Sequence, residues 1–318
     1  MADTKRSPLR GWLVRALGSA VLLGLLLWWL PLDEVTAGFA RVPLATWVAV
    51  WALFAAGHIA AAGKWWQLLG RAMAFGTAIR AHFAGLAANL CLPGAAGGDV
   101  VRAGVAQMAI RDGGKVISGS VADRLIDMLA LAILTGAGAL GLASGAAGGA
   151  LALQALGMMA LALVGAFWVA PRFVPWLWGR FPALPARSLA LKTAAEFGAL
   201  AGKPFMLVST LALSTAIQAL FVILAMWLGS AVGVALPAAV WFFAWPLAKL
   251  LAVLPIALNG LGLREATLAG LMVPFGASGA EVVAAGLAWQ AVLFATGILG
   301  AIVLALSGFS LRANPVVE

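Results

Sequence analysis

The sequence of 318 residues has no tyrosine, one cysteine and few charged residues. Charged residues make up 10% of it and hydrophobic residues 64%, whereas soluble domains have about 25% charged and about 45–50% apolar residues. This scarcity of charge excludes a water-soluble globule. A membrane-spanning helix needs about 20 apolar residues, so the length allows about six to eight crossings and leaves no room for a soluble catalytic domain.

The single Cys91 cannot form an internal disulfide. Neither a CxxC pair nor a Cys/His cluster occurs, so we expect no metal, iron–sulfur centre or other cofactor. The formal net charge of +9 does not indicate binding to nucleic acid, because the basic residues are scattered between apolar runs. Their positions instead report membrane topology.

The apolar runs predict an all-α polytopic membrane protein with a single transmembrane domain over residues 1–318. Further apolar segments follow the first run, which favours an uncleaved helix there over the alternative of a signal peptide. The positive-inside rule places both termini in the cytoplasm of a bacterial inner membrane, together with the basic segment 171–203, in which residues 188–200 suit a surface helix. Six full spans are expected, at about Gly11–Leu30, Leu44–Gly63, Ser118–Leu142, Leu151–Ala170, Phe205–Gly229 and Val282–Leu306.

Two further hydrophobic stretches, residues 80–111 and 237–275, are interrupted by Pro, Gly and charged residues. The apolar halves of the first have roughly 10 residues, which cross only about half of a hydrocarbon core about 30 Å thick. We therefore expect a re-entrant helix pair that enters from the cytoplasm. The second stretch forms either two complete spans or a hairpin that enters from outside. Hairpins from opposite faces would match the inverted repeats of secondary transporters, for a total of eight segments.

The two breaks have related chemistry, since each combines Asn, Pro and Gly with an acid and an arginine at the start of the next helix. Free N–H groups at such a half-helix N-terminus, with an arginine beside them, suit a phosphate group. The alternative is structural: the first acid caps its helix, the second acid and arginine form a local pair, and the asparagines are turn residues. The candidate residues are Asn89, Asp99 and Arg102 in the first break and Asn259, Arg264 and Glu265 in the second.

A third group of charges, Asp123, Arg124 and Asp127, runs directly into an apolar helix. The two aspartates are four residues apart and share a helix face, and Arg124 is able to reach Asp127. From Ser118, Asp127 lies roughly 14 Å along the helix, near mid-membrane, where charges usually face a bundle interior or an aqueous path. Arg124 would hold an anionic headgroup while the aspartates orient it or carry a proton. The alternative is a static ion-pair network.

Other polar residues in the apolar runs have less specific interpretations. Histidines 58 and 82 more often serve packing than proton transfer. Lys249 either snorkels to the interface or lines a cavity. Gln218 and Gln290 are expected to form hydrogen bonds between helices.

Three motifs in this order resemble the transmembrane domain family of lysylphosphatidylglycerol synthase. They are N-x3-PG-x2-GGD-x2-R from Asn89 to Arg102, the acidic cluster from Asp123 to Asp127, and P-x3-NGLG-x-RE from Pro255 to Glu265. The resemblance implies a flippase-like inner-membrane protein that moves or handles a lipid, often with a polar or cationic headgroup, and is not an enzyme.

This sequence departs from the family in two respects. Asp123 stands where many members carry the longer Glu. The sequence ends at Glu318 without a soluble aminoacyl-transfer domain, so lysyl-lipid synthesis is not expected. Stand-alone relatives of similar length include a branch associated with hopanoid synthesis, which is the candidate branch for this chain.

The leading hypothesis is a lipid flippase whose partners are membrane lipids with an anionic or polar headgroup, working alone, as a homo-oligomer or with a lipid-synthesis partner. ATP is not expected to drive it, since the run GAAGGD lacks the Lys-Ser/Thr of a P-loop. One alternative is an intramembrane enzyme that modifies lipid headgroups with the paired aspartates as acid and base. Another is a scaffold subunit of a lipid-synthesis complex, such as one for hopanoids.

Overall fold

The computed structural model describes residues 32–91, 97–142, 171–182, 184–251 and 262–306, with a few isolated positions between 157 and 169. Within these stretches the regular structure is helical and contains no strand, as the composition predicts for an all-α polytopic membrane protein. The spans predicted at Gly11–Leu30 and Leu151–Ala170 fall outside the continuous described stretches. The other four predicted spans are all present as helices.

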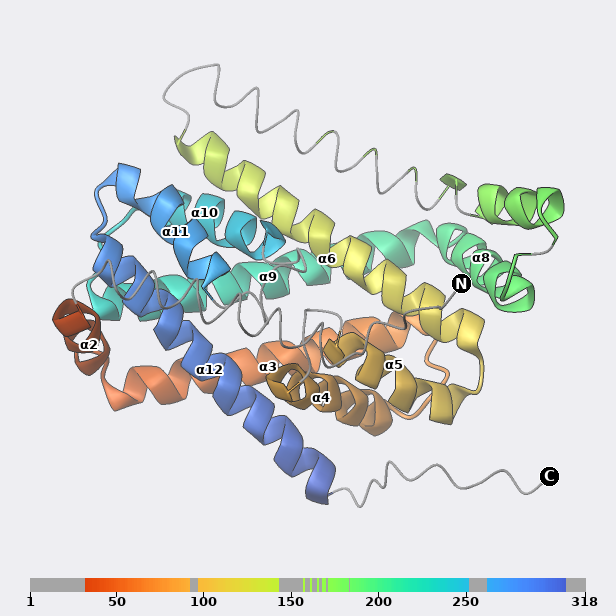
Figure 1. Ribbon diagram of the computed structural model, residues 1–318, viewed down its shortest axis with the longest axis horizontal. Coiled ribbons are helices and arrows are strands. Elements are labelled where there is room, and N and C mark those ends of the chain that lie inside the picture. The colour runs from red at the N-terminus through yellow and green to blue at the C-terminus, as the bar shows by residue number, and fades with distance from the viewer. Residues whose placement is uncertain are drawn as a thin grey trace, which may run out of the picture.

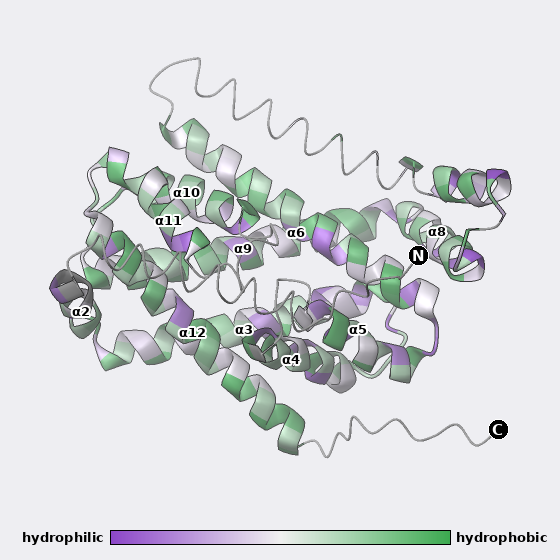
Figure 2. Cartoon of the chain, viewed as in Figure 1, coloured by the Kyte–Doolittle hydropathy of each residue, from purple (hydrophilic) through white to green (hydrophobic). Residues whose placement is uncertain are grey.

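These four long helices have 25 to 30 residues, which at 1.5 Å per residue corresponds to about 38–45 Å. They are apolar and long enough to cross a membrane with some tilt. Figure 2 shows that α12 and the outer part of α6 consist mostly of hydrophobic residues. The four helices are α3 (Leu44–Leu68), α6 (Gly113–Leu142), α9 (Pro204–Val232) and α12 (Gly279–Leu306).

Both interrupted stretches form pairs of shorter helices. A helix of 14 residues reaches about 21 Å, too short for a full crossing at right angles to the membrane. The arms of the first pair are longer than the roughly 10 residues expected, because Arg80 does not end the helix: it lies exposed and donates to Gly76 O and Thr77 Oγ1 of its own turn. The pairs are α4 (Phe75–Cys91) with α5 (Gly97–Ile110), and α10 (Ala238–Leu251) with α11 (Leu263–Met272), which the short 3₁₀ turn η1 (Val273–Phe275) follows.

The two helix pairs lie at opposite ends of the bundle (Figure 1). Along α12, the inner end of the first pair packs at Gly297, where an added Cβ atom would lie 2.7 Å from Leu90. The inner end of the second pair lies at Gly286, whose carbonyl accepts a hydrogen bond from Arg264 at 3.0 Å. These two levels are eleven residues apart on a 28-residue helix. Each pair therefore contacts a different part of α12, and the two inner ends are separated by about 16 Å along that helix.

Two short helices mark the two ends of the bundle. Helix α2 (Leu32–Ala40) lies at one end, where Gly38 approaches Val232 and Arg41 forms an ion pair with Glu281 at 3.7 Å. Helix α8 (Arg187–Ala201) lies at the other end and packs on the start of α6 (Figure 1). The helix predicted at residues 188–200 is thus present. We call these ends the α2 end and the α8 end.

Close helix contacts depend on small residues, as is usual for packing within a membrane. Gly300 of α12 lies against the carbonyl oxygen of Phe83 on α4, and Gly138 of α6 lies against the α10 backbone at Phe242 and Phe243. Without these glycines the half-length helices would be held away from the long ones. The close approach is what places the inner ends of the hairpins inside the bundle.

We predict that Gly138→Ala destabilises the protein, because the new methyl group would collide with the backbone at Phe242 and Phe243. Overpacking of this kind typically costs about 1–3 kcal/mol. The measurement is the melting temperature of the purified protein in detergent. Gly270→Ala is the matched control, since nothing lies within 4 Å of a Cβ atom there. Equal melting temperatures for the two variants would contradict the packing of α10 on α6.

Candidate functional site

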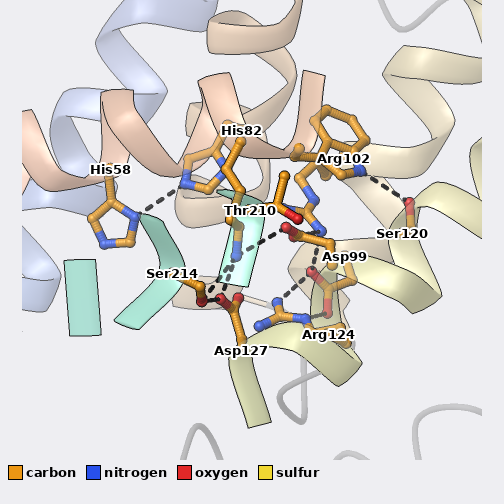
Figure 3. A network of polar contacts seen from close by, with 12 residues as sticks. His58, His82, Asp99, Arg102, Ser120, Arg124, Asp127, Thr210 and Ser214 are labelled. Atoms are coloured by element: carbon orange, nitrogen blue, oxygen red, sulfur yellow. Dashed lines mark hydrogen bonds and ion pairs between the residues drawn. The ribbon is translucent and has the colours of Figure 1, made fainter. Parts of the chain in front are cut away.

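Six charged side chains from three helices meet inside the bundle, at the start of α5 (Figure 3). The first two turns of α5, which carry Asp99 and Arg102, lie beside the charged turn of α6. Helix α3 contributes a lysine. We call these residues the central ion-pair cluster: Lys64, Asp99, Arg102, Asp123, Arg124 and Asp127.

The most buried part of the cluster centres on Asp123, which is 2% exposed. Its carboxylate accepts a hydrogen bond from Arg102 Nη2 at 3.0 Å and forms an ion pair with Lys64 Nζ at 3.1 Å. The Arg102 guanidinium also lies 4.5 Å from the centre of the Trp65 ring. An isolated charge at this depth would be very costly, so these groups stay together. The shorter Asp at position 123 still reaches both partners.

Helix α9 joins the cluster through Ser214, a residue that the sequence did not single out. Ser214 Oγ donates to Asp127 Oδ1 at 2.5 Å and accepts a hydrogen bond from Lys64 Nζ at 3.3 Å. Lys64 Nζ also contacts the Asp127 carboxylate directly. The lysine thus bridges Asp123 and Asp127, which share a face of α6 as predicted.

Arg124 has a different partner from the expected one. It forms a two-pronged pair with Asp99 of α5, with Nε donating to Oδ2 at 2.6 Å and Nη2 contacting Oδ1, and not with Asp127. Residue 124 is one position along the helix from 123 and projects about 100° away from it. It therefore faces α5, while Asp123 and Asp127 face α3. The Arg124 side chain is 49% exposed, which makes this pair the accessible edge of the cluster.

Lys64 was missed by the sequence prediction, which ended the span at Gly63 and did not include the lysine among the candidate residues. Helix α3 continues to Leu68, so Lys64 lies inside the helix and is 1% exposed. Four of the five residues that follow Lys64, up to Leu69, are Trp or Leu, and they were the signal of a longer span.

The acid and arginine of the second break lie apart from the central cluster and satisfy each other. Arg264 Nη2 donates to Glu265 Oε1 at 2.5 Å, and the same arginine donates to Gln290 of α12 at 3.2 Å. Glu265 Oε2 also accepts the N–H of Gly262 at 2.7 Å. A free helix N-terminus for phosphate was expected here, but the carboxylate of Glu265 already occupies that N–H. This agrees with the alternative of a local pair.

The two asparagines of the breaks have different outcomes. Asn89 Oδ1 accepts the N–H of Gly98 at 2.9 Å and so ties α4 to the start of α5. Asp99 lies one residue further, within the first turn of α5, and its carboxylate pairs with arginines. Asn259 lies outside the described residues. Asn89 thus has a structural contact, in agreement with the simpler of its two interpretations.

A second set of polar groups lies along α9, towards the α2 end from Ser214. Lys249 Nζ donates to Gln218 Oε1 at 2.8 Å and lies 5.5 Å from the Phe221 ring centre. The ring centre of His58 lies 5.2 Å from that of Phe221. The Nδ1 atom of His58 lies 3.0 Å from Nε2 of His82. Lys249 thus points into the bundle and does not snorkel. No group of three or more potential metal ligands occurs among the residues described.

The description of the family model that matches this sequence is the lysylphosphatidylglycerol synthase TM region, and the match covers residues 12–300. The chain belongs to this family. No curated protein matches the chain. Membership supports a membrane function related to lipids. The first two of the three motifs that carried the resemblance contribute five of the six charged residues of the central cluster, and the sixth, Lys64, lies outside the motifs.

We predict that Lys64→Met lowers stability strongly, because it leaves the carboxylates of Asp123 and Asp127 inside the bundle without their shared cation. Breaking a buried pair in this way costs about 3–5 kcal/mol. The measurement is thermal unfolding in detergent. Arg80→Ala serves as control, since that arginine is exposed and bonds only within its own helix. Full stability of the Lys64→Met protein would show that the lysine does not hold the aspartates together.

Proposed function

We propose that this protein is a lipid flippase or lipid transporter, which moves a lipid with a phosphate or other polar headgroup across a bacterial inner membrane. The observation that carries the proposal is the accessible Arg124–Asp99 pair at the edge of a buried, fully paired charge cluster. Charges at membrane depth usually mark a path for polar groups. A cluster needed only for packing would have no reason to expose one of its arginines.

The geometry of the Arg124–Asp99 pair allows both residues to exchange partners. Asp99 Oδ1 already lies 3.6 Å from Arg102 Nη2, so Asp99 has a second arginine within reach when Arg124 turns away. Arg124 then binds a lipid phosphate through the same two-pronged geometry that it uses for the carboxylate. Both Asp99 and Arg124 thus keep a partner of opposite charge during the exchange, while the bound phosphate adds one negative charge to the three cations and three carboxylates of the cluster.

The arrangement of the two hairpins supports transport over a static role. Their inner ends contact α12 from opposite ends of the bundle, at Gly297 and Gly286, so charged residues of both pairs lie inside the bundle. Inverted repeats with broken helices use this arrangement to expose one site alternately to the two sides. Asp123 and Asp127, held through Lys64, would orient the headgroup or couple a proton to its movement.

The exposed basic residues of the α8 end support a cytoplasmic location for that end. The basic segment 171–203 contains Arg172, Arg180, Arg187, Lys192 and Lys203, all exposed, against the single acid Glu196. An excess of Lys and Arg in short loops is typical of the cytoplasmic side. The hairpin α4–α5 would then enter from the cytoplasm and α10–α11 from outside.

We predict that single cysteines at positions 75 and 185 react with a membrane-impermeant thiol reagent only after permeabilisation, whereas cysteines at positions 34, 145 and 277 react in intact cells. The background lacks Cys91. The expected pattern follows from the charge of the α8 end. Labelling of position 185 from outside would reverse the proposed orientation.

We predict that Arg124→Ala and Asp127→Asn reduce lipid exchange at least tenfold, as expected for the loss of a charge-assisted hydrogen bond of roughly 1.5–3 kcal/mol. The assay uses purified protein in liposomes with fluorescent lipids and follows quenching of the outer leaflet. Arg80→Ala is the matched arginine control and should exchange lipid at the wild-type rate. All variants are compared at equal amounts of monodisperse, inserted protein.

Thin-layer analysis of the same liposomes tests the alternatives. Leaflet exchange without a new product supports transport. A new lipid product would replace the proposal with an intramembrane enzyme, and the absence of both exchange and product over a broad lipid panel would favour a scaffold. Unchanged exchange in both variants would reduce the central ion-pair cluster to a packing element.

A further inference from the structure

Lys249 is a cation inside the bundle that forms no ion pair with any carboxylate in the described part of the chain. Its ammonium is held by the neutral oxygen of Gln218 at 2.8 Å and by the face of the Phe221 ring at 5.5 Å. No Asp or Glu occurs in the sequence between Glu196 and Glu265. A lysine at such depth is normally paired with an anion.

The other charges near Lys249 inside the bundle balance one another, so the positive charge of Lys249 is unbalanced. The central ion-pair cluster combines three basic side chains with three carboxylates, and Arg264 is matched by Glu265. Residues 92–96 and 252–261 do not alter this balance, since they contain no charged side chain. The charged side chains of the central ion-pair cluster, Arg264, Glu265 and Lys249 therefore sum to one positive charge.

Lys249 lies between the central ion-pair cluster and the Arg264–Glu265 pair. Its partner Gln218 is one helical turn, about 6 Å, from Ser214, which bonds to Asp127. On α10, Lys249 is one turn from Trp245, whose ring centre lies 5.9 Å from the Arg264 guanidinium. A headgroup that leaves Arg124 and moves towards the second hairpin meets Lys249 next.

We propose that Lys249, positioned by Gln218, binds the phosphate of the transported lipid and makes the protein selective for lipids whose headgroup carries a net negative charge. The inference rests on the proposed transport function and specifies its substrate class. A phosphodiester with no other charge, as in phosphatidylglycerol, matches the single surplus charge. A zwitterionic or cationic headgroup brings an ammonium that the neutral surroundings leave unpaired beside Lys249.

The test compares three lipids with acyl-chain fluorophores in phosphatidylcholine liposomes: phosphatidylglycerol, phosphatidylcholine and lysyl-phosphatidylglycerol. The wild-type protein should exchange the anionic lipid about tenfold faster than the other two. Lys249→Met, similar in length but uncharged, should lose this preference, while Lys249→Arg should keep it. Lys203→Met removes an exposed lysine of the α8 end and should behave as wild type.

Lipid retention measured by native mass spectrometry on the same proteins gives a second readout that needs no transport. The anion site is supported if the wild type retains phosphatidylglycerol preferentially and Lys249→Met or Lys249→Gln abolishes this preference. This holds even if no exchange is observed and the transport proposal fails. Equal exchange and equal retention of the three lipids by the wild type overturn the inference while exchange itself stands. A preference that survives Lys249→Met also overturns it.

Discussion

The architecture depends on the cost of placing charges in a medium that cannot solvate them. Six ionised side chains lie inside the bundle near the first hairpin, and none tolerates isolation there. Lys64 brings α3 to α6, Arg102 and Asp99 bring α5 to α6, and Ser214 brings α9 to the same point. In lipid, where apolar burial gives helices little reason to associate, these pairs and close glycine contacts hold them in register.

The half-length helices follow from the same constraint. A chain reversal inside the membrane exposes N–H and C=O groups, so it is tolerated only where protein or a polar cavity surrounds it. The first hairpin meets this condition through Asn89, which accepts the N–H of Gly98, and the second through Glu265, which accepts the N–H of Gly262. The helices that these contacts begin also carry the buried Arg102 and Arg264. Structure and proposed transport chemistry are thus served by one set of side chains.

Sequence patterns anticipated a large part of the fold and of the candidate site. Long apolar runs identified α3, α6, α9 and α12, and Pro, Gly and charged residues within apolar runs identified both interrupted regions, because these signals are local. They were less accurate for the helix ends: α3 continues through Lys64 since the lysine finds two aspartates on another helix. Ser214 could not be anticipated, because a serine in an apolar helix carries no signal until its neighbour is known.

By itself, the sequence determined the class of protein, the positions of the breaks and the spacing that puts Asp123 and Asp127 on one helix face. These features depend on hydropathy, on Pro and Gly backbone preferences and on helical periodicity, all of which act within a few residues. Only the tertiary structure decided which charges pair: Arg124 with Asp99, Lys64 with both aspartates, Arg264 with Glu265, and Lys249 with no acid in the described chain. Ion-pair partners are set by the rotation of each helix and by the helix that lies beside it, and neither is encoded in local spacing.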